Sequence, residues 1–259
     1  MSTSTRTQET LLEASGLTKH YGTIHAAHDI DLEIGYGEVV AIVGDNGAGK
    51  STLIKMLSGA VEPDVGEIKV ESVTQRFKGP NDARAAGIET LYQDLALLPN
   101  LDATTNLFLG RELVAGGLLR PFGVLERRQM RNDAAEHLKE LHIDIPKIWG
   151  AQVESLSGGQ RQSVAIARAL VWASKLLIMD EPTAALGVAQ SRAVLDLVQR
   201  VRERGTSVIV ISHILPHVIE LADRIVVMRH GEKVADLPAS DLTQDRLIEL
   251  IIGYKRSRA

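Results

Sequence analysis

The chain contains no cysteine and few aromatic residues, and both absences limit what it can be. Without cysteine the 259-residue chain has no disulfide and no thiolate metal ligand, so a disulfide scaffold and a thiol redox centre are excluded. Aromatic residues make up only 3%, so aliphatic side chains must fill the core. With 44% hydrophobic and 24% charged residues, the composition is typical of a globular protein rather than a disordered or fibrous one.

Long apolar runs and dense runs of Lys and Arg are also absent. No segment approaches the ~20 apolar residues that span a bilayer, and the polar stretch 1–9 lacks the apolar core of a secretory signal. We therefore expect a cytoplasmic chain that is not itself a pore. The formal net charge is -4, and the basic residues cluster only in the tail at Lys255, Arg256 and Arg258, so nucleic acid is not expected as a partner.

The most informative pattern is an apolar strand followed by a glycine-rich loop and a helix. Residues 29–43 alternate apolar and polar positions and then become continuously apolar, which is typical of a half-exposed strand leading into a buried one. After the loop, Leu53, Ile54 and Leu57 have helical spacing, which predicts a helix from Lys50 to Leu57.

Further apolar runs at 176–179 and 208–211 predict buried parallel strands separated by a helix over 188–204. Together with the first strand, they predict an α/β protein. Weaker patterns predict helices at 104–109 and 126–141, a strand, turn and strand at 223–236, and a helix at 243–252.

The glycine-rich loop fits G-x-x-x-x-G-K-[ST], a pattern that binds nucleotide phosphates when it follows a strand and opens a helix. Glycines let backbone N–H groups converge on phosphate oxygens, and the positive helix end faces the same anion. Lys50 is predicted to neutralise the β and γ phosphates and Ser51 to bind Mg²⁺. The alternative, a glycine turn with a solvated lysine, does not explain the strand and helix around the loop. The predicted ATP-binding residues here are Gly44, Asp45, Asn46, Gly47, Ala48, Gly49, Lys50, Ser51 and Thr52.

Two adjacent carboxylates, Asp180 and Glu181, end the predicted strand 176–179, at the sheet edge where open α/β proteins bind ligands. Asp180 is predicted to bind Mg²⁺, and Glu181 to accept a proton from the attacking water. Alone, such a pair more often caps a helix or lies in a solvated turn. Combined with the phosphate loop, it predicts a nucleotide hydrolase without indicating what the energy drives.

The segment Leu156-Ser157-Gly158-Gly159-Gln160 resembles the LSGGQ motif peculiar to ABC ATPases, and Ser157 is also a suitable helix N-cap. The resemblance covers essentially the whole chain. It implies a P-loop NTPase of the ABC ATPase fold, with a mostly parallel core sheet, an N-terminal antiparallel β part and an inserted α-helical subdomain. We expect one domain over 10–255, with a RecA-like core at about 10–93 and 165–235, a helical subdomain at about 94–164, and a C-terminal hairpin and helix at about 224–255.

The resemblance also implies roles for three isolated residues. Gln93 matches the Q-loop glutamine that senses Mg²⁺ and the attacking water, His213 matches the switch histidine at the γ-phosphate, and Tyr21 matches the aromatic that stacks on adenine. Without the family match, Gln93 and His213 would be ordinary surface polar groups and Tyr21 a partly buried core residue.

In this family two subunits face each other head to tail around ATP. The implied contribution from the opposite subunit is the segment Ser157, Gly158, Gly159 and Gln160. One departure concerns the segment 182–187, where Gly187 stands at the place of the usual D-loop aspartate. This puts in doubt the usual carboxylate contact across the dimer.

More narrowly, residues 44–60, 88–98 and 181–188 resemble ATPases of bacterial monosaccharide importers of the ribose, xylose and fructose group. This implies a homodimer that uses ATP and Mg²⁺, lies on the inner face of the bacterial cell membrane, and works with two transmembrane permease subunits and a periplasmic sugar-binding protein. Leucines near Gln93 form either a groove for a membrane-subunit helix or part of the core: Leu95, Leu97, Leu98 and Leu101.

Three alternatives remain open from sequence. One is an importer of another small solute. A soluble ABC ATPase of DNA repair or translation typically carries a long coiled-coil insertion or tandem cassettes, which this sequence lacks. A P-loop kinase does not explain residues 156–160. The sugar and the role of residues 111–124 are not assigned by the sequence.

Overall fold

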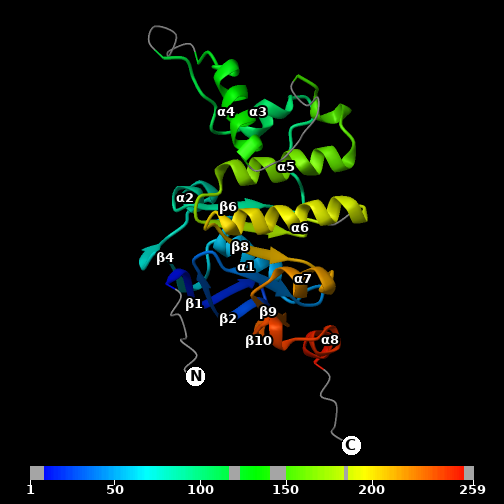
Figure 1. Cartoon of the computed structure of the whole chain (residues 1–259). Helices are drawn as coiled ribbons and strands as arrows, with labels where there is room; N and C mark the ends of the chain where they lie inside the picture. The colour runs from blue at the N-terminus through cyan, green and yellow to red at the C-terminus, as the bar shows by residue number, and fades with distance from the viewer. Residues whose placement is uncertain (1–8, 117–122, 141–149, 184–185, 254–259) are drawn as a thin grey trace, which may run out of the picture.

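The computed structural model describes residues 9–116, 123–140, 150–183 and 186–253. Figure 1 shows the β-sheets in one part of the molecule and a group of helices beyond them. That group contains α3 (Ala103–Leu107), α4 (Arg127–Glu140) and α5 (Gly158–Trp172). No helix within the described ranges is both long and apolar enough to cross a membrane.

The core is a six-stranded sheet in the order β10-β9-β3-β8-β7-β6. Five strands are parallel and β10 pairs antiparallel with β9 at one edge. This confirms the predicted mostly parallel sheet. The strands are β10 (Glu232–Pro238), β9 (Arg224–Arg229), β3 (Val39–Val43), β8 (Ser207–Ile211), β7 (Leu176–Asp180) and β6 (Ile88–Leu91).

A second, antiparallel sheet has the order β2-β1-β4-β5 and confirms the predicted N-terminal β part. The apolar segment 29–43 is divided between the two sheets, because a turn after Gly35 separates β2 from β3. The Ser207 hydroxyl fixes this turn by donating to Gly35 O and accepting from Gly37 N. The four strands are β1 (Thr10–Tyr21), β2 (Ile24–Gly35), β4 (Val65–Val70) and β5 (Val73–Gln75).

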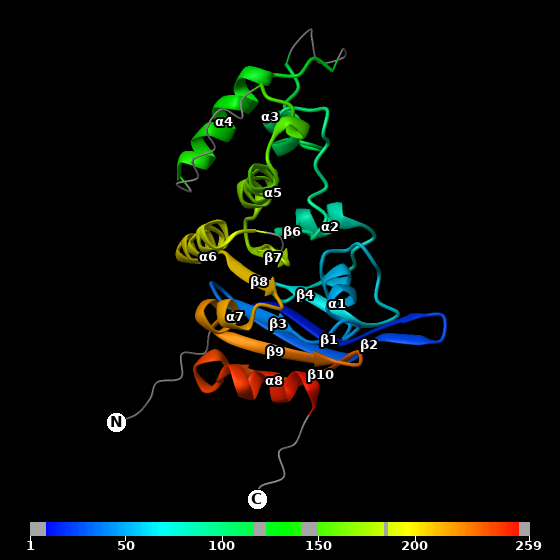
Figure 2. The ribbon, with the colours of Figure 1, turned by 90° about the vertical axis from the view of Figure 1, so that its right-hand side faces the viewer.

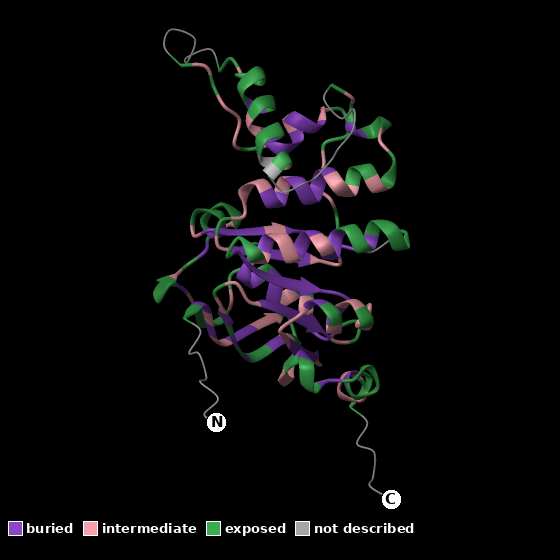
Figure 3. Cartoon of the chain, in the orientation of Figure 1, coloured by how far each residue is buried: buried purple, intermediate pink, exposed green. Residues whose placement is uncertain are grey.

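Both faces of the core sheet are covered, as continuously apolar strands require. On one face Val40 and Ile42 pack with α1 (Lys50–Leu57) and the antiparallel sheet. On the other face Val39 packs with α5 and α6 (Val188–Glu203), while Ala41 and Val43 pack with α7 (Leu215–Leu221) and α8 (Gln244–Ile252). Figure 2 shows α1 and α6 on opposite sides of the sheet, and Figure 3 shows the strands between them as buried.

Helix ends follow local capping. α1 begins and ends at the predicted residues, and the Thr243 side chain caps α8 by accepting from Arg246 N. α3 starts one residue earlier than predicted because Asp102 accepts from Thr105 N, and it ends at Leu107, two residues before the predicted end. Two short helices, α2 (Pro80–Ala85) and α7, were not predicted, since neither is long enough to show a helical period. Residue 141, the predicted end of α4, lies outside the described residues.

The helical group is joined to the sheet through α5. The Arg168 guanidinium donates to Leu95 O and Ala96 O, just after β6. One turn further along, at the last residue of the helix, the Trp172 indole donates to Leu107 O, and Arg111 lies 4.7 Å from the centre of its ring. Arg111 also bonds Glu89 of β6 at 2.7 Å. Part of the segment 111–124 therefore ties the helices to the strand that precedes Gln93.

Candidate active site

Most of the predicted site residues meet at the C-terminal edge of the core sheet. Strands β3, β8, β7 and β6 are parallel neighbours, so the segments that follow them lie at one edge. The phosphate loop 44–49 follows β3, His213 follows β8, Asp180 and Glu181 stand at the end of β7, and Gln93 follows β6.

Close backbone approaches fix the shape of the phosphate loop. Gly44 has φ +155°, and a Cβ there would lie 2.3 Å from Met228 O of β9. Gly49 has φ +97°, and a Cβ there would lie 2.5 Å from Ala26 O of β2. Only glycine fits both positions without moving the neighbouring backbone. Strands β9 and β2 thus hold the loop above the N-terminus of α1.

Lys50 lies within this loop. Its ammonium group donates to Gly44 O at 2.8 Å and to Asp45 O at 2.9 Å. Burial lowers the pKa of Lys50, and the negative charges of Glu181 and Asp180 oppose that shift. A cation held by the loop at the start of a helix is an arrangement that binds phosphate. Ser51, exposed, and Thr52, half-buried, follow in the first turn of α1.

Asp180 and Glu181 differ in surroundings although they are neighbours. Burial raises the pKa of Asp180, the charge of Glu181 raises it further, and Lys50 opposes the shift. Glu181 has φ +51°, a conformation uncommon for a residue with a side chain. Its N–H donates to Ile211 O at 3.0 Å, so the end of β8 holds it in this conformation. Such strain, maintained by neighbours, is found often at functional sites.

The Glu181 carboxylate meets the imidazole of His213. Nδ1 of His213 lies 2.8 Å from Oε2 of Glu181, and because a carboxylate only accepts hydrogen bonds, Nδ1 is the donor. The Glu181 side chain is 15% exposed and that of His213 69%. The histidine therefore lies on the solvent side of the carboxylate.

Oxygen donors suited to Mg²⁺ are present at the same edge. Ser51, Asp180 and Gln93 offer a hydroxyl, a carboxylate and an amide oxygen, all of the hard type that Mg²⁺ prefers. The described residues hold no group of three or more His, Cys, Asp or Glu placed for a metal ion. Mg²⁺ bound with a nucleotide needs fewer protein ligands, because phosphate oxygens and water complete its shell. Burial and the charge of Glu181 raise the pKa of Asp180, and a nearby cation would offset both.

The signature segment starts α5 as predicted. The Ser157 hydroxyl accepts from Gln160 N, and the Gln160 side chain accepts from Ser157 N, which forms a capping box. Ser157, Gly158 and Gln160 are exposed, and Gly159 is half-buried. The cap leaves this helix start open to another molecule.

Tyr21 and Gln93 are both exposed. Tyr21 ends β1, pairs with Ile24 of β2 and is 46% exposed. Gln93 lies two residues beyond β6.

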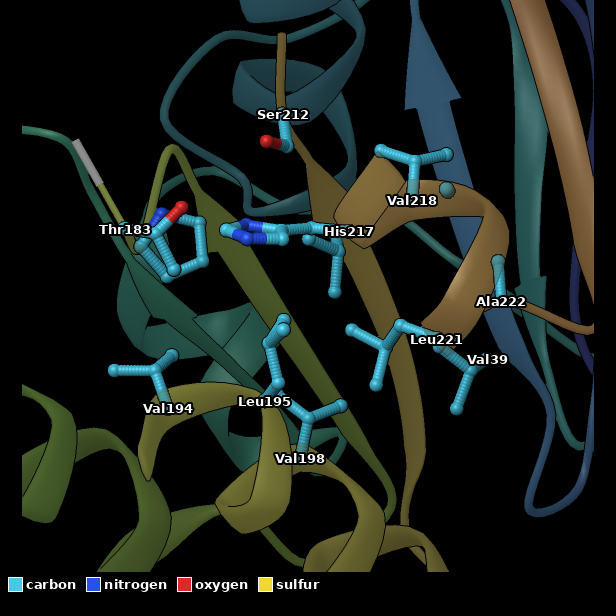
Figure 4. Close-up of a pocket in the computed structure, with 13 residues that line it drawn as sticks. Val39, Thr183, Val194, Leu195, Val198, Ser212, His217, Val218, Leu221 and Ala222 are labelled. Carbon is cyan, nitrogen blue, oxygen red and sulfur yellow. The ribbon is translucent and has the colours of Figure 1, made fainter. Parts of the chain in front are cut away.

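A small cavity of about 10 Å³ lies between α6, α7 and the residues after Glu181. Figure 4 shows the imidazole of His217 pointing from α7 toward Thr183 among apolar side chains such as Val198. Nδ1 of His217 is buried and makes no hydrogen bond to a described residue. The cavity has room for about one water molecule and none for a nucleotide, so it is separate from the phosphate site.

A contact between Gln162 and Pro182 beside the site is not predicted by the sequence. The Gln162 side chain on α5 donates to Pro182 O, next to Glu181, at 2.8 Å. No local pattern indicates this partner, since the two residues are 20 apart in sequence and meet only through packing.

The fold and this edge define a P-loop ATPase. The family described as ABC transporter matches residues 27–184, more than half of the chain. The protein belongs to the ABC transporter family. It is the kind of subunit that binds and hydrolyses ATP for such a transporter.

Similar proteins cover nearly the whole chain. The fructose import ATP-binding protein of Rhizobium meliloti is 47% identical over 96% of both chains. The xylose/arabinose import ATP-binding protein of Sulfolobus acidocaldarius is 42% identical over 94% of both. A ribose import ATP-binding protein of Yersinia pestis is 39% identical over 94% of this chain, which spans only 46% of that relative.

Solved structures share the fold. A nucleotide-free ATP-binding cassette from an ABC transporter superimposes with a TM-score of 0.80 at 25% identity, covering 95% of this chain and 100% of that one. A dimeric cassette in a post-hydrolysis state, bound to ADP and phosphate, superimposes with a TM-score of 0.75 at 26% identity, covering 88% and 99%. These likenesses confirm the predicted ABC ATPase fold.

Proposed function

We propose that the protein hydrolyses ATP to drive import of a monosaccharide through a membrane permease. The observation that supports this most is the strained, strand-end Glu181 bonded to His213 beside Lys50. The sugar-import relatives at 47% and 42% identity support the transport role. They are named for fructose and for xylose or arabinose, so they support the sugar class and not one sugar.

The site residues have separate roles in ATP hydrolysis. The loop 44–52 binds the ATP phosphates, Lys50 neutralises the β and γ phosphates, and Tyr21 stacks on adenine. Glu181 takes the proton from the attacking water, while His213 donates to that carboxylate from Nδ1 and lies beside the γ-phosphate. Ser51, Asp180 and Gln93 hold Mg²⁺, which when bound supplies charge neutralisation on the phosphates.

The exposed signature segment 157–160 is proposed to complete the ATP site of a second copy of this chain. The dimeric cassette that shares this fold supports a head-to-tail dimer. ATP binding closes this dimer, and losing the γ-phosphate removes contacts that favoured the closed state. We propose the same domain limits as the sequence suggested, 10–255 with a helical subdomain at about 94–164.

Partner subunits are proposed from the same relatives: two permease subunits, a periplasmic sugar-binding protein, and a position on the inner face of the bacterial membrane. Leu98 is 43% exposed, whereas Leu95 and Leu97 are partly buried against the core. The exposed Leu98 is the natural contact for a permease segment. Leu98→Asp is expected to abolish sugar uptake while basal hydrolysis stays near wild type, and unchanged uptake would rule the contact out.

The test is genetic and biochemical. In a strain lacking this protein, uptake of one monosaccharide is expected to fall and to recover with the wild-type chain but not with Lys50→Ala. Affinity capture from detergent-solubilised membranes is expected to recover a multi-span permease that stimulates hydrolysis. Recovery of a ribosome or DNA-bound partner instead would favour a soluble ABC ATPase of translation or repair.

A further inference from the structure

The Gln162 hydrogen bond joins the signature helix to the catalytic segment of the same chain. Gln162 lies just over one turn after the N-cap Ser157, and its Nε2 donates to Pro182 O at 2.8 Å. Pro182 is buried and directly follows Glu181. Any shift of the first turns of α5 therefore acts on the peptide between Pro182 and Thr183, one residue beyond the proposed base.

Glu181 is sensitive to such a shift because both sides of it are held. Its own N–H donates to Ile211 O of β8, and the carbonyl of the following residue, Pro182, accepts from Gln162. With φ at +51°, the residue keeps its conformation only while its surroundings impose it. The Gln162 bond therefore links the position of Glu181 to the position of the first turns of α5.

Gly187 makes this contact more important. A Cβ at Gly187 would lie 2.6 Å from Oε1 of Gln190, so the Gln190 side chain takes the space where an aspartate would start. The same Gln190 passes within 3.9 Å of the Cβ position of Gly159 in the signature segment. The groove between α5 and α6, of about 200 Å³, is lined by both glutamines together with Leu186. The contacts between the signature helix and the segment after Glu181 are thus made within one chain.

We propose that Gln162 is a positioning residue that couples the partner's ATP site to Glu181 of its own chain. The inference rests on the proposed head-to-tail dimer, in which the signature segment 157–160 meets the ATP held by the partner. When that ATP contacts the first turn of α5, the Gln162 side chain holds Pro182 in place. Glu181 is then aligned with the ATP that is bound by its own chain. Communication between the two ATP sites then does not require a carboxylate at position 187, where this chain has a glycine.

The test uses a tandem of two full-length chains joined by a flexible linker, in two backgrounds. In the first both phosphate loops are intact; in the second one copy carries Lys50→Ala, so its site does not hold ATP. Gln162→Leu removes the donor at similar size. In the first background it is placed in both copies. In the second it is placed only in the copy whose phosphate loop is intact. Gln129→Leu, on the exposed face of α4, is the matched control.

With both loops intact, Gln162→Leu is expected to lower kcat per site about tenfold with KM for ATP nearly unchanged, a size usual for coupling between sites. With the partner site empty, the same change is expected to alter kcat less than about twofold, because nothing remains to transmit. Gln129→Leu is expected to leave both backgrounds unchanged.

Equal losses in the two backgrounds would mean a merely structural role, and no loss in either would mean no role; each overturns the coupling. Both outcomes leave the proposed function in place, since the unmodified tandem still hydrolyses ATP. An unmodified tandem without hydrolysis would instead overturn the proposed function and the coupling with it.

Discussion

Nδ1 of His213 lies 2.8 Å from Oε2 of Glu181, which joins the ends of two neighbouring parallel strands at the proposed catalytic centre. The pair predicts linked effects on hydrolysis. His213→Ala is expected to lower kcat about 100-fold, because Glu181 loses the group that orients it. In a Glu181→Gln background the same change is expected to cost almost nothing further, since residues acting as a unit are not additive. Steady-state phosphate release from the four proteins measures this; independent, multiplying losses would show that the pair does not act together.

The ion pair between Glu89 and Arg111 predicts an effect on stability. The Glu89 side chain is 8% exposed and bonds Arg111 at 2.7 Å, with Arg84 at 3.3 Å. Arg111→Met is expected to lower the free energy of unfolding by about 2–3 kcal/mol, because a buried carboxylate loses its closer partner while Arg84 remains. Adding Glu89→Leu is expected to recover part of that loss, as the buried charge is then gone. Urea unfolding of both proteins checks this, and a double variant less stable than the single one would contradict it.

The backbone approach at Gly44 predicts a steric cost. Gly44→Ala is expected to lower the free energy of unfolding, measured without nucleotide, by about 1–3 kcal/mol more than Gly47→Ala. Both glycines have positive φ, but a Cβ at Gly44 would lie 2.3 Å from Met228 O and one at Gly47 would meet nothing within 4 Å. Equal losses for the two variants would show that β9 does not constrain the loop in this way.

Asp64 predicts a dependence of stability on pH. The Lys19 ammonium and the backbone N–H of His20 bond the Asp64 carboxylate and lower its pKa from 3.8 to about 2. Because the folded-state pKa is the lower one, the stabilisation is fully present above the unfolded value and is lost as pH falls through the folded one. The stability advantage over Asp64→Asn is therefore expected to shrink between about pH 4 and pH 2. Denaturant midpoints for both proteins across this range measure it; an advantage that stays constant down to the lowest pH would contradict the assignment.

The parts of the site that sequence predicts well are those built from consecutive residues. The loop 44–49 between a strand and a helix, and the carboxylates at the end of β7, require no knowledge of distant contacts. The Ser157 cap follows from its own next three residues. Strand-end placement then brings these segments to one sheet edge, because parallel strands share a direction.

The missed features depend on packing between distant segments. The partner of Gln162 lies across the interface of α5 with the residues after β7, and nothing near position 162 indicates it. The division of residues 29–43 between two sheets depends on Ser207, about 170 residues away. The Glu89–Arg111 pair likewise joins a strand to a segment whose sequence showed no role.

Glu181→Gln is the variant that shows whether this chain is an ATPase with Glu181 as its base. Steady-state phosphate release and equilibrium binding of ATP are measured on the wild type and this variant. Hydrolysis is expected to fall about 100- to 10,000-fold, the usual contribution of a well-placed base, while the Kd for ATP stays within about twofold. A variant that keeps most of its hydrolysis would show that Glu181 is not the base and that the proton of the attacking water goes to another group.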